Sequence, residues 1–173
     1  MVLVQTTSLK LSEGSTPPGT RKLSFKSSTK RDGLQNRVAA PTLGSADDPS
    51  LNGVTVDVYN SSGSGEKITV AIPGGIGWKV TSGGTSYRYK NPDRNGAIAK
   101  LTIKTDQLRV SGGGIDFGYS IDEATQGSVA VRVRTGVTGT LWCADATGPR
   151  VDRVGSFQAT PKTAAPGVCP TLP

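Results

Sequence analysis

Hydrophobic and polar residues alternate over many short segments of this chain. The clearest case is Ser128–Arg134, where Val129, Val131 and Val133 would face one way and Arg132 and Arg134 the other. A period of two residues is typical of a strand that is buried on one face. The alternation predicts strands at Ser8–Leu11, Arg21–Lys26, Val54–Tyr59, Lys67–Ile72, Gly77–Thr81, Ser86–Lys90, Ala97–Lys104, Gln107–Ser111, Ile115–Tyr119, Ser128–Arg134, Thr140–Ala144 and Arg150–Ala159.

Turn residues separate these segments, since the chain has 23 Gly and 11 Pro. Gly83-Gly84 predicts a hairpin between 77–81 and 86–90, and Gly112–Gly114 predicts another between 107–111 and 115–119. Many short strands at regular spacing indicate an all-β fold, an antiparallel β-sandwich. The sequence leaves jelly-roll and immunoglobulin-like topologies open.

The alternation also assigns the residues of one longer strand to its two faces. In the segment Ala97–Lys104, strict alternation places Ala97, Ala99, Leu101 and Ile103 on one face. The same alternation puts Ile98 on the opposite face, beside the lysines. We therefore expect Ile98 to face away from the core.

Residues 1–50 are patterned more weakly than residues 51–173. We expect 51–173 to form the sandwich core, and 1–50 to form a basic arm or edge strands, with a long loop at 38–52. The net charge is +7, and residues 1–40 alone carry +5 of it. A basic patch in this region, which would attract an anionic polymer, comprises Arg21, Lys22, Lys26, Lys30, Arg31 and Arg37. The alternative is a basic surface that only aids solubility.

The two cysteines, Cys143 and Cys169, lie in a predicted strand and in a proline-rich tail. A disulfide between them would hold the tail and contribute about 3–4 kcal/mol in the chain-entropy model. The alternative is two free thiols in a cytosolic protein. A disulfide predicts an extracellular or cell-surface location, with a signal or upstream region removed before Met1. No apolar run approaches the roughly 20 residues of a membrane span.

Several segments resemble the C-terminal, β-rich, disulfide-closed module of secreted and surface proteins of environmental bacteria. They are GYSIDEATQGSVAVRVRTG (118–136), LWCADA (141–146) and VGSFQATPKTAAPGVCP (154–170), preceded by VTVDVYNSSGSGEKITVAIP (54–73), GWKV (77–80) and YRYKNP (87–92). The resemblance covers about residues 50–170 and implies a β-rich architecture outside the cell. No activity is assigned to these modules, so the resemblance implies no catalytic residue.

The chain contains no histidine. A Ser-His-Asp triad, a general base of ordinary pKa near neutrality and a His-rich metal site are therefore excluded. We expect a protein that is not an enzyme and that needs no cofactor.

Two groups of residues are candidate sites. Trp78, Tyr87 and Tyr89 would form an aromatic platform for sugar rings or bases; the alternative is that these rings belong to the core. Asn91, Asp93 and Asn95 match the first half of a calcium loop. Its twelfth position is Thr102, where calcium needs a carboxylate, so a hairpin loop is the alternative.

These features support three functional hypotheses. The first is a non-catalytic structural, adhesion or assembly module of a bacterial surface or secreted protein, with a polysaccharide or another surface protein as partner. The second is a carbohydrate-binding module that uses the aromatic platform. The third is a coat or nucleic-acid-associated protein with a basic N-terminal arm. Self-assembly through exposed edge strands is compatible with the first.

Overall fold

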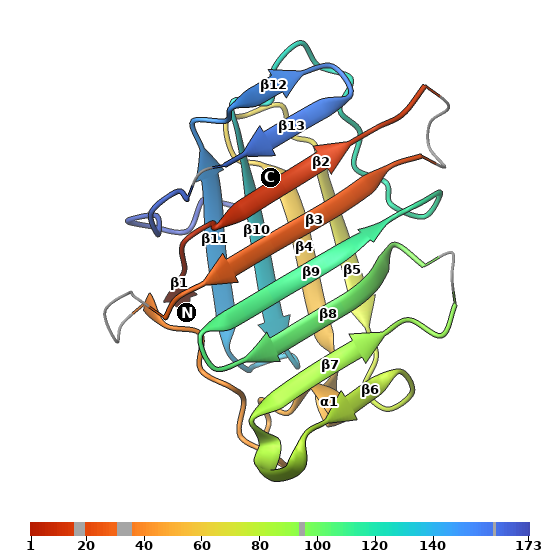
Figure 1. The fold of residues 1–173 in the computed structure, drawn as a ribbon, viewed down its shortest axis with the longest axis vertical. Coiled ribbons are helices and arrows are strands. Elements are labelled where there is room, and N and C mark those ends of the chain that lie inside the picture. The colour runs from red at the N-terminus through yellow and green to blue at the C-terminus, as the bar shows by residue number, and fades with distance from the viewer. Residues whose placement is uncertain (16–19, 31–35, 94–95, 161) are drawn as a thin grey trace.

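The computed structural model describes residues 1–15, 20–30, 36–93, 96–160 and 162–173, which form two β-sheets packed face to face (Figure 1). The first sheet has the strand order β1 (Val2–Leu3), β11 (Leu141–Thr147), β10 (Ser128–Thr135), β4 (Val54–Asn60) and β5 (Lys67–Ile72). Its neighbouring strands are antiparallel except for β1 and β11, which are parallel.

The second sheet has eight strands, all antiparallel to their neighbours. Its order is β12 (Val151–Arg153), β13 (Ser156–Ala159), β2 (Ser8–Ser12), β3 (Lys22–Ser28), β9 (Gln107–Gly113), β8 (Ile98–Lys104), β7 (Ser86–Lys90) and β6 (Trp78–Val80). Its strands run obliquely across those of the first sheet (Figure 1). The short helices α1 (Pro49–Asn52) and η2 (Ser82–Gly84) lie in connections. The prediction of an all-β sandwich is confirmed.

Alternation along the strands builds the core between the two sheets. Val129, Val131 and Val133 of β10 are buried, as predicted, and Val131 pairs with Val58 of β4 and with Ala144 of β11. Trp142 lies on the same inner face, because it pairs with Val133, and its side chain is buried. Apolar side chains from both sheets thus meet in one continuous core.

Strand β8 departs from the predicted alternation. The pairing register with β9 shifts between Ile98 and Lys100, which is a β-bulge. Because a bulge inserts one extra residue on one strand, the side chains before it change face. Ile98 is therefore buried together with Leu101, and Ala99 is exposed. The prediction that Ala99 faces inward and Ile98 outward is wrong.

The segment 115–119 was also predicted as a strand, and that prediction is wrong. It belongs to the connection from β9 to β10, which crosses from one sheet to the other. Backbone N–H groups here bond to side chains: the Ser120 amide donates to Glu66 (2.9 Å) and the Ile121 amide to Glu13 (3.1 Å). Phe117 and Tyr119 are still buried, so the connection closes one end of the core.

The first 50 residues take part in the fold more fully than predicted. Strands β2 and β3 lie in the interior of the eight-stranded sheet, with Leu9, Leu11, Leu23 and Phe25 in the core. They are therefore neither an arm nor edge strands. Of the described strands within residues 1–50, only the short β1 occupies a sheet edge. Alternation identified β2 and β3 but could not show which strands they pair with.

The connection from residue 38 to residue 53 is held in place by two adjacent carboxylates. Asp48 caps helix α1 by accepting from the Ser50 amide (2.9 Å), and it also accepts from the Gly44 amide (2.8 Å). Asp47 accepts from the Thr140 amide and hydroxyl and from the Thr135 hydroxyl. Burial alone would raise the pKa of each carboxyl, but these hydrogen bonds outweigh it, and both pKa values lie below the ordinary one.

A stability difference that depends on pH follows from these two carboxylates. A depressed folded-state pKa stabilises the protein above the ordinary value of about 3.9, and that stability is lost as the pH falls through the folded-state values. We expect Asp47→Asn/Asp48→Asn to destabilise the protein by about 1–3 kcal/mol at pH 7, the size of hydrogen bonds to charged acceptors. In urea unfolding at pH 7 and at pH 2 the difference from wild type should shrink at pH 2; a constant difference would contradict this account.

Candidate functional site

The outer face of the eight-stranded sheet carries a concentration of positive charge. Its strands β13, β2, β3, β9, β8, β7 and β6, within the bounds that the structure gives them, contain nine basic residues and no acidic one. The nine are Lys10, Lys22, Lys26, Lys79, Arg88, Lys90, Lys100, Lys104 and Arg109. Each is adjacent in sequence to a residue of the inner face, so all nine project outward. We call this surface the basic face; its sheet lies in front in Figure 1.

Several of these cations lie directly opposite one another on neighbouring strands. The cross-strand pairs of like charge are Lys26 with Arg109, Lys79 with Arg88, and Lys90 with Lys100. Like charges in directly opposed positions destabilise a sheet. The outer face of the five-stranded sheet differs, because there Arg132 lies opposite Asp57. Directly opposed like charges therefore repel one another on the basic face, whereas the opposed charges on the outer face of the five-stranded sheet attract.

No neighbouring group of the described chain neutralises this charge. None of the nine cations forms an ion pair or a side-chain hydrogen bond with another described residue. Most of them are exposed, and Lys26 and Lys104 are partly buried. The charge is therefore available to a partner from solution.

Small polar side chains lie between the cations and hollow the surface. One depression is lined by Ser8, Ser24, Phe25, Lys26, Lys100, Thr102, Arg109, Val110 and Ser111. A second is lined by Arg88, Thr102, Lys104, Gln107 and Arg109, and a third by Gly77, Lys79, Arg88, Tyr89, Lys90, Lys100 and Thr102. Since the three share residues, they form one shallow tract across strands β3, β9, β8, β7 and β6.

The predicted N-terminal basic patch contributes to this face only in part. Lys22 and Lys26 belong to it, and Lys30 is exposed just beyond the end of β3. The other described members are engaged elsewhere: Arg21 pairs with Glu13 (2.7 Å) and Arg37 with Asp106 (2.6 Å). Arg31 lies outside the described residues.

The predicted basic patch did not include six further cations of the basic face. Lys79, Arg88, Lys90, Lys100, Lys104 and Arg109 all come from residues 77–111. A signal for them exists in the sequence, because Arg88 and Lys90, and likewise Lys100 and Lys104, fall on the polar face of their predicted strands. These basic residues are spread along the sequence and form no charge cluster there, but they share the outward face of their strands.

The predicted aromatic platform does not form. Tyr87 and Tyr89 share a face as expected, but it is the inner face, where both side chains are buried. The Tyr87 hydroxyl donates to the Pro41 carbonyl (3.2 Å). Trp78 is half-buried against Tyr89, with ring centroids 5.3 Å apart. The prediction of a stacking surface is wrong, because the core needs these rings to fill it.

The calcium candidate falls in the hairpin between β7 and β8. The Asn91 side chain accepts from the Asp93 amide (2.9 Å) and donates to the Ile98 carbonyl (3.1 Å), so it organises the turn. Asn95 lies outside the described residues. Among the described residues, no group of three or more Asp, Glu, His or Cys side chains could hold a metal ion.

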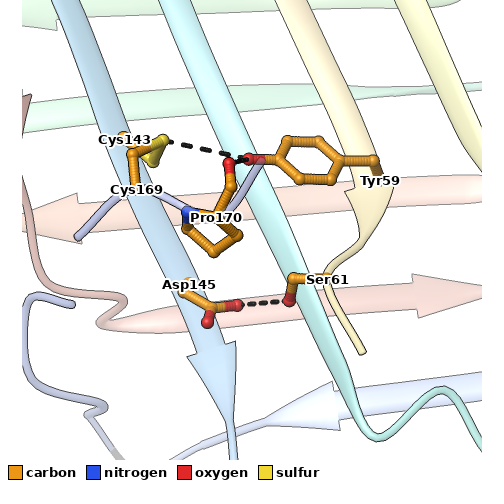
Figure 2. Close-up of a disulfide and its surroundings, with 6 residues drawn as sticks. All are labelled: Tyr59, Ser61, Cys143, Asp145, Cys169 and Pro170. Carbon is orange, nitrogen blue, oxygen red and sulfur yellow. Dashed lines mark hydrogen bonds between the residues drawn. A yellow bond between two sulfur atoms is a disulfide. The ribbon is translucent and has the colours of Figure 1, made fainter. Parts of the chain in front are cut away.

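The predicted disulfide between Cys143 and Cys169 is confirmed. It attaches the C-terminal tail to β11 on the outer face of the five-stranded sheet (Figure 2). From β4, the Tyr59 hydroxyl donates to the Pro170 carbonyl (2.6 Å). The Lys67 ammonium of β5 donates to the carbonyl of Pro173. The tail therefore crosses from β11 over β10 and β4 to β5, and Tyr59 is buried beneath it.

The tail and the basic face thus lie on opposite sides of the sandwich. Within the described parts of the chain, no helix has the length and apolar character needed to cross a bilayer. Comparison with known protein families, curated protein sequences and solved structures finds no protein that matches this chain.

Proposed function

We propose that this protein is a non-catalytic adhesion module of the extracellular space that attaches to an anionic polymer through its basic face. The observation that carries the proposal is a set of nine cations on one sheet face that have no ion pair or side-chain hydrogen bond with any described residue; three pairs of them repel one another. A fold that keeps such repulsion gives up stability, which is common at binding surfaces. The disulfide supports a place in an oxidising compartment.

The open, shallow tract across the basic face suits a polymer better than a small molecule. Small ligands are usually bound in enclosed pockets, and the depressions here are shallow and continuous across strands. Long-range attraction from many like charges concentrates a polyanion at the surface and fixes it through several weak contacts. Binding of this kind requires no conformational change of the sheet.

Charge reversal on the basic face tests the proposal. Each exposed contact contributes up to about 1 kcal/mol, and its reversal adds a repulsion of similar size, so Arg88→Glu/Arg109→Glu should weaken polyanion binding by about 100-fold. Binding is measured by titration with heparin at several salt concentrations, where the logarithm of the affinity should fall linearly with the logarithm of salt.

The matched control is Arg134→Glu/Arg150→Glu, which changes the net charge equally. Arg134 lies on the outer face of the five-stranded sheet, and Arg150 precedes β12. This variant should retain most of the wild-type affinity. Equal losses in the two variants, or no binding by wild type, would contradict the proposal.

The charge-reversal variant Arg88→Glu/Arg109→Glu also has an expected effect on stability. The carboxylates introduced at positions 88 and 109 lie opposite Lys79 and Lys26, so two repulsive pairs become attractive. The Arg88→Glu/Arg109→Glu protein should therefore unfold at the same or a higher urea concentration than wild type. Weaker binding by a protein of undiminished stability separates a loss of function from a loss of fold.

A further inference from the structure

We propose that the polymer is an anionic polysaccharide, one that carries carboxylate or sulfate groups, and not a nucleic acid. This inference rests on the proposed function and narrows it to one class of partner. Three features of the basic face support it: the side chains that are absent from it, its width, and the polar groups between its cations.

No aromatic side chain of these strands projects from the basic face. In the seven described strands that form it, the aromatic residues are Phe25, Trp78, Tyr87, Tyr89 and Phe157. All five belong to the core or pack against it. Proteins that bind single strands without sequence preference stack bases on aromatic rings, a contribution of about 1–3 kcal/mol per base. Phe25 and Tyr89 line two of the depressions, but both side chains are buried. The basic face therefore attracts a single strand but offers no exposed ring on which its bases can stack.

The width of the face is also unsuited to reading a duplex. The major groove of DNA admits an α-helix or a two-stranded ribbon. The cations occupy six adjacent strands, from β2 to β6 in the order of the sheet. Such a wide surface cannot enter a groove and contacts a duplex only at its backbone phosphates. Seven of the nine cations are lysines, whereas two-pronged recognition of phosphate favours arginine.

The polar groups between the cations match a chain of sugars. Ser8, Ser24, Ser111, Thr102, Gln107 and Gln158 lie on the outer face, and none of these side chains bonds to another described residue. Along one row across the sheet, Lys26, Arg109, Thr102, Arg88 and Lys79 follow one another at steps of about 4.8 Å. An extended polymer with both hydroxyl and anionic groups could use every position in that row.

The test compares polymers at equal concentrations of charge. Polygalacturonate supplies carboxylates, dextran sulfate supplies sulfates, and oligothymidylate and duplex DNA supply phosphates; all are titrated at physiological salt, where distant charges are screened. We expect one or both polysaccharides to bind at least about tenfold more tightly than either DNA. Arg88→Glu/Arg109→Glu should abolish that binding, and Arg134→Glu/Arg150→Glu should retain it.

A second variant pair tests the hydroxyls without altering charge. Thr102→Val/Ser111→Ala should weaken polysaccharide binding by about threefold to tenfold and leave DNA binding unchanged, because the lost groups bind sugar hydroxyls. If both DNAs bind as tightly as the polysaccharides and the charge reversal abolishes all binding, the proposed function stands and the polysaccharide assignment is overturned. If no polymer binds, both are overturned.

Discussion

Phe117→Ala is expected to destabilise the protein by about 3–5 kcal/mol, while Ile115→Ala changes its stability by less than about 0.5 kcal/mol. The two residues lie two positions apart in the connection between β9 and β10. Phe117 is 1% exposed and Ile115 is 63% exposed. The phenyl ring packs near the Tyr119 ring, with centroids 6.4 Å apart. Its loss would leave a cavity at the closed end of the core.

The difference between the two substitutions distinguishes the irregular connection seen in the structure from the regular strand that the sequence predicts. In a strand, Ile115, Phe117 and Tyr119 would share one face, and both alanine substitutions would cost similar amounts. In the structure only Phe117 and Tyr119 reach the core. Urea unfolding of the two variants at pH 7 measures both losses of stability and decides between a strand and an irregular connection. Similar losses for both substitutions would show that the connection is a regular strand.

The failed prediction at 115–119 has a physical cause. Alternation of apolar residues indicates which side chains are buried, and here it was right for Phe117 and Tyr119 but wrong for Ile115, which is exposed. It does not report whether the backbone pairs with another strand. In this connection the Phe117 amide donates to the nearby Gly114 carbonyl (3.3 Å), and the Ser120 and Ile121 amides that follow donate to carboxylates of distant segments, Glu66 and Glu13. Nothing local in the sequence distinguishes that arrangement from a sheet ladder.

The central strands of both sheets were predictable because their local pattern of apolar residues agrees with their burial in the fold. Val129, Val131 and Val133, or Leu23 and Phe25, have local patterns that agree with their final burial. The sequence could not show that β3 pairs with β9, more than seventy positions further on. The basic face depends on that pairing, because it brings Lys26 opposite Arg109. Its residues could therefore be predicted singly but not as one surface.

Loss of the disulfide is expected to destabilise the protein by about 3–4 kcal/mol. The bond joins residues separated by 26 positions, and closing a loop of this length restricts the unfolded chain by about that amount. The Cys143→Ala/Cys169→Ala variant and reduced wild-type protein should unfold at the same, lower urea concentration. That is a large fraction of the roughly 5–15 kcal/mol that stabilises an ordinary domain. Unchanged unfolding of the reduced protein would contradict this expectation.

A second measurement reports whether the tail is released in the folded state. Burial raises the pKa of Tyr59; Arg132 opposes this rise, and Asp145 and Asp57 reinforce it. Burial likewise raises the pKa of Tyr87, Tyr89 and Tyr119, which the tail does not cover. Without the disulfide, Tyr59 loses its cover and its bond to Pro170, so its pKa should return toward the ordinary value of about 10.

An absorbance titration of tyrosine in the double-alanine variant should therefore show one group that ionises at lower pH than in wild type, and Tyr59→Phe in the same background should remove it. If that group is absent while stability still falls, the disulfide acts only on the unfolded chain. If it is present, the bond also holds the tail over Tyr59. In that case the tail is the cover that keeps the outer face of the five-stranded sheet closed while the opposite, basic face stays open to a partner.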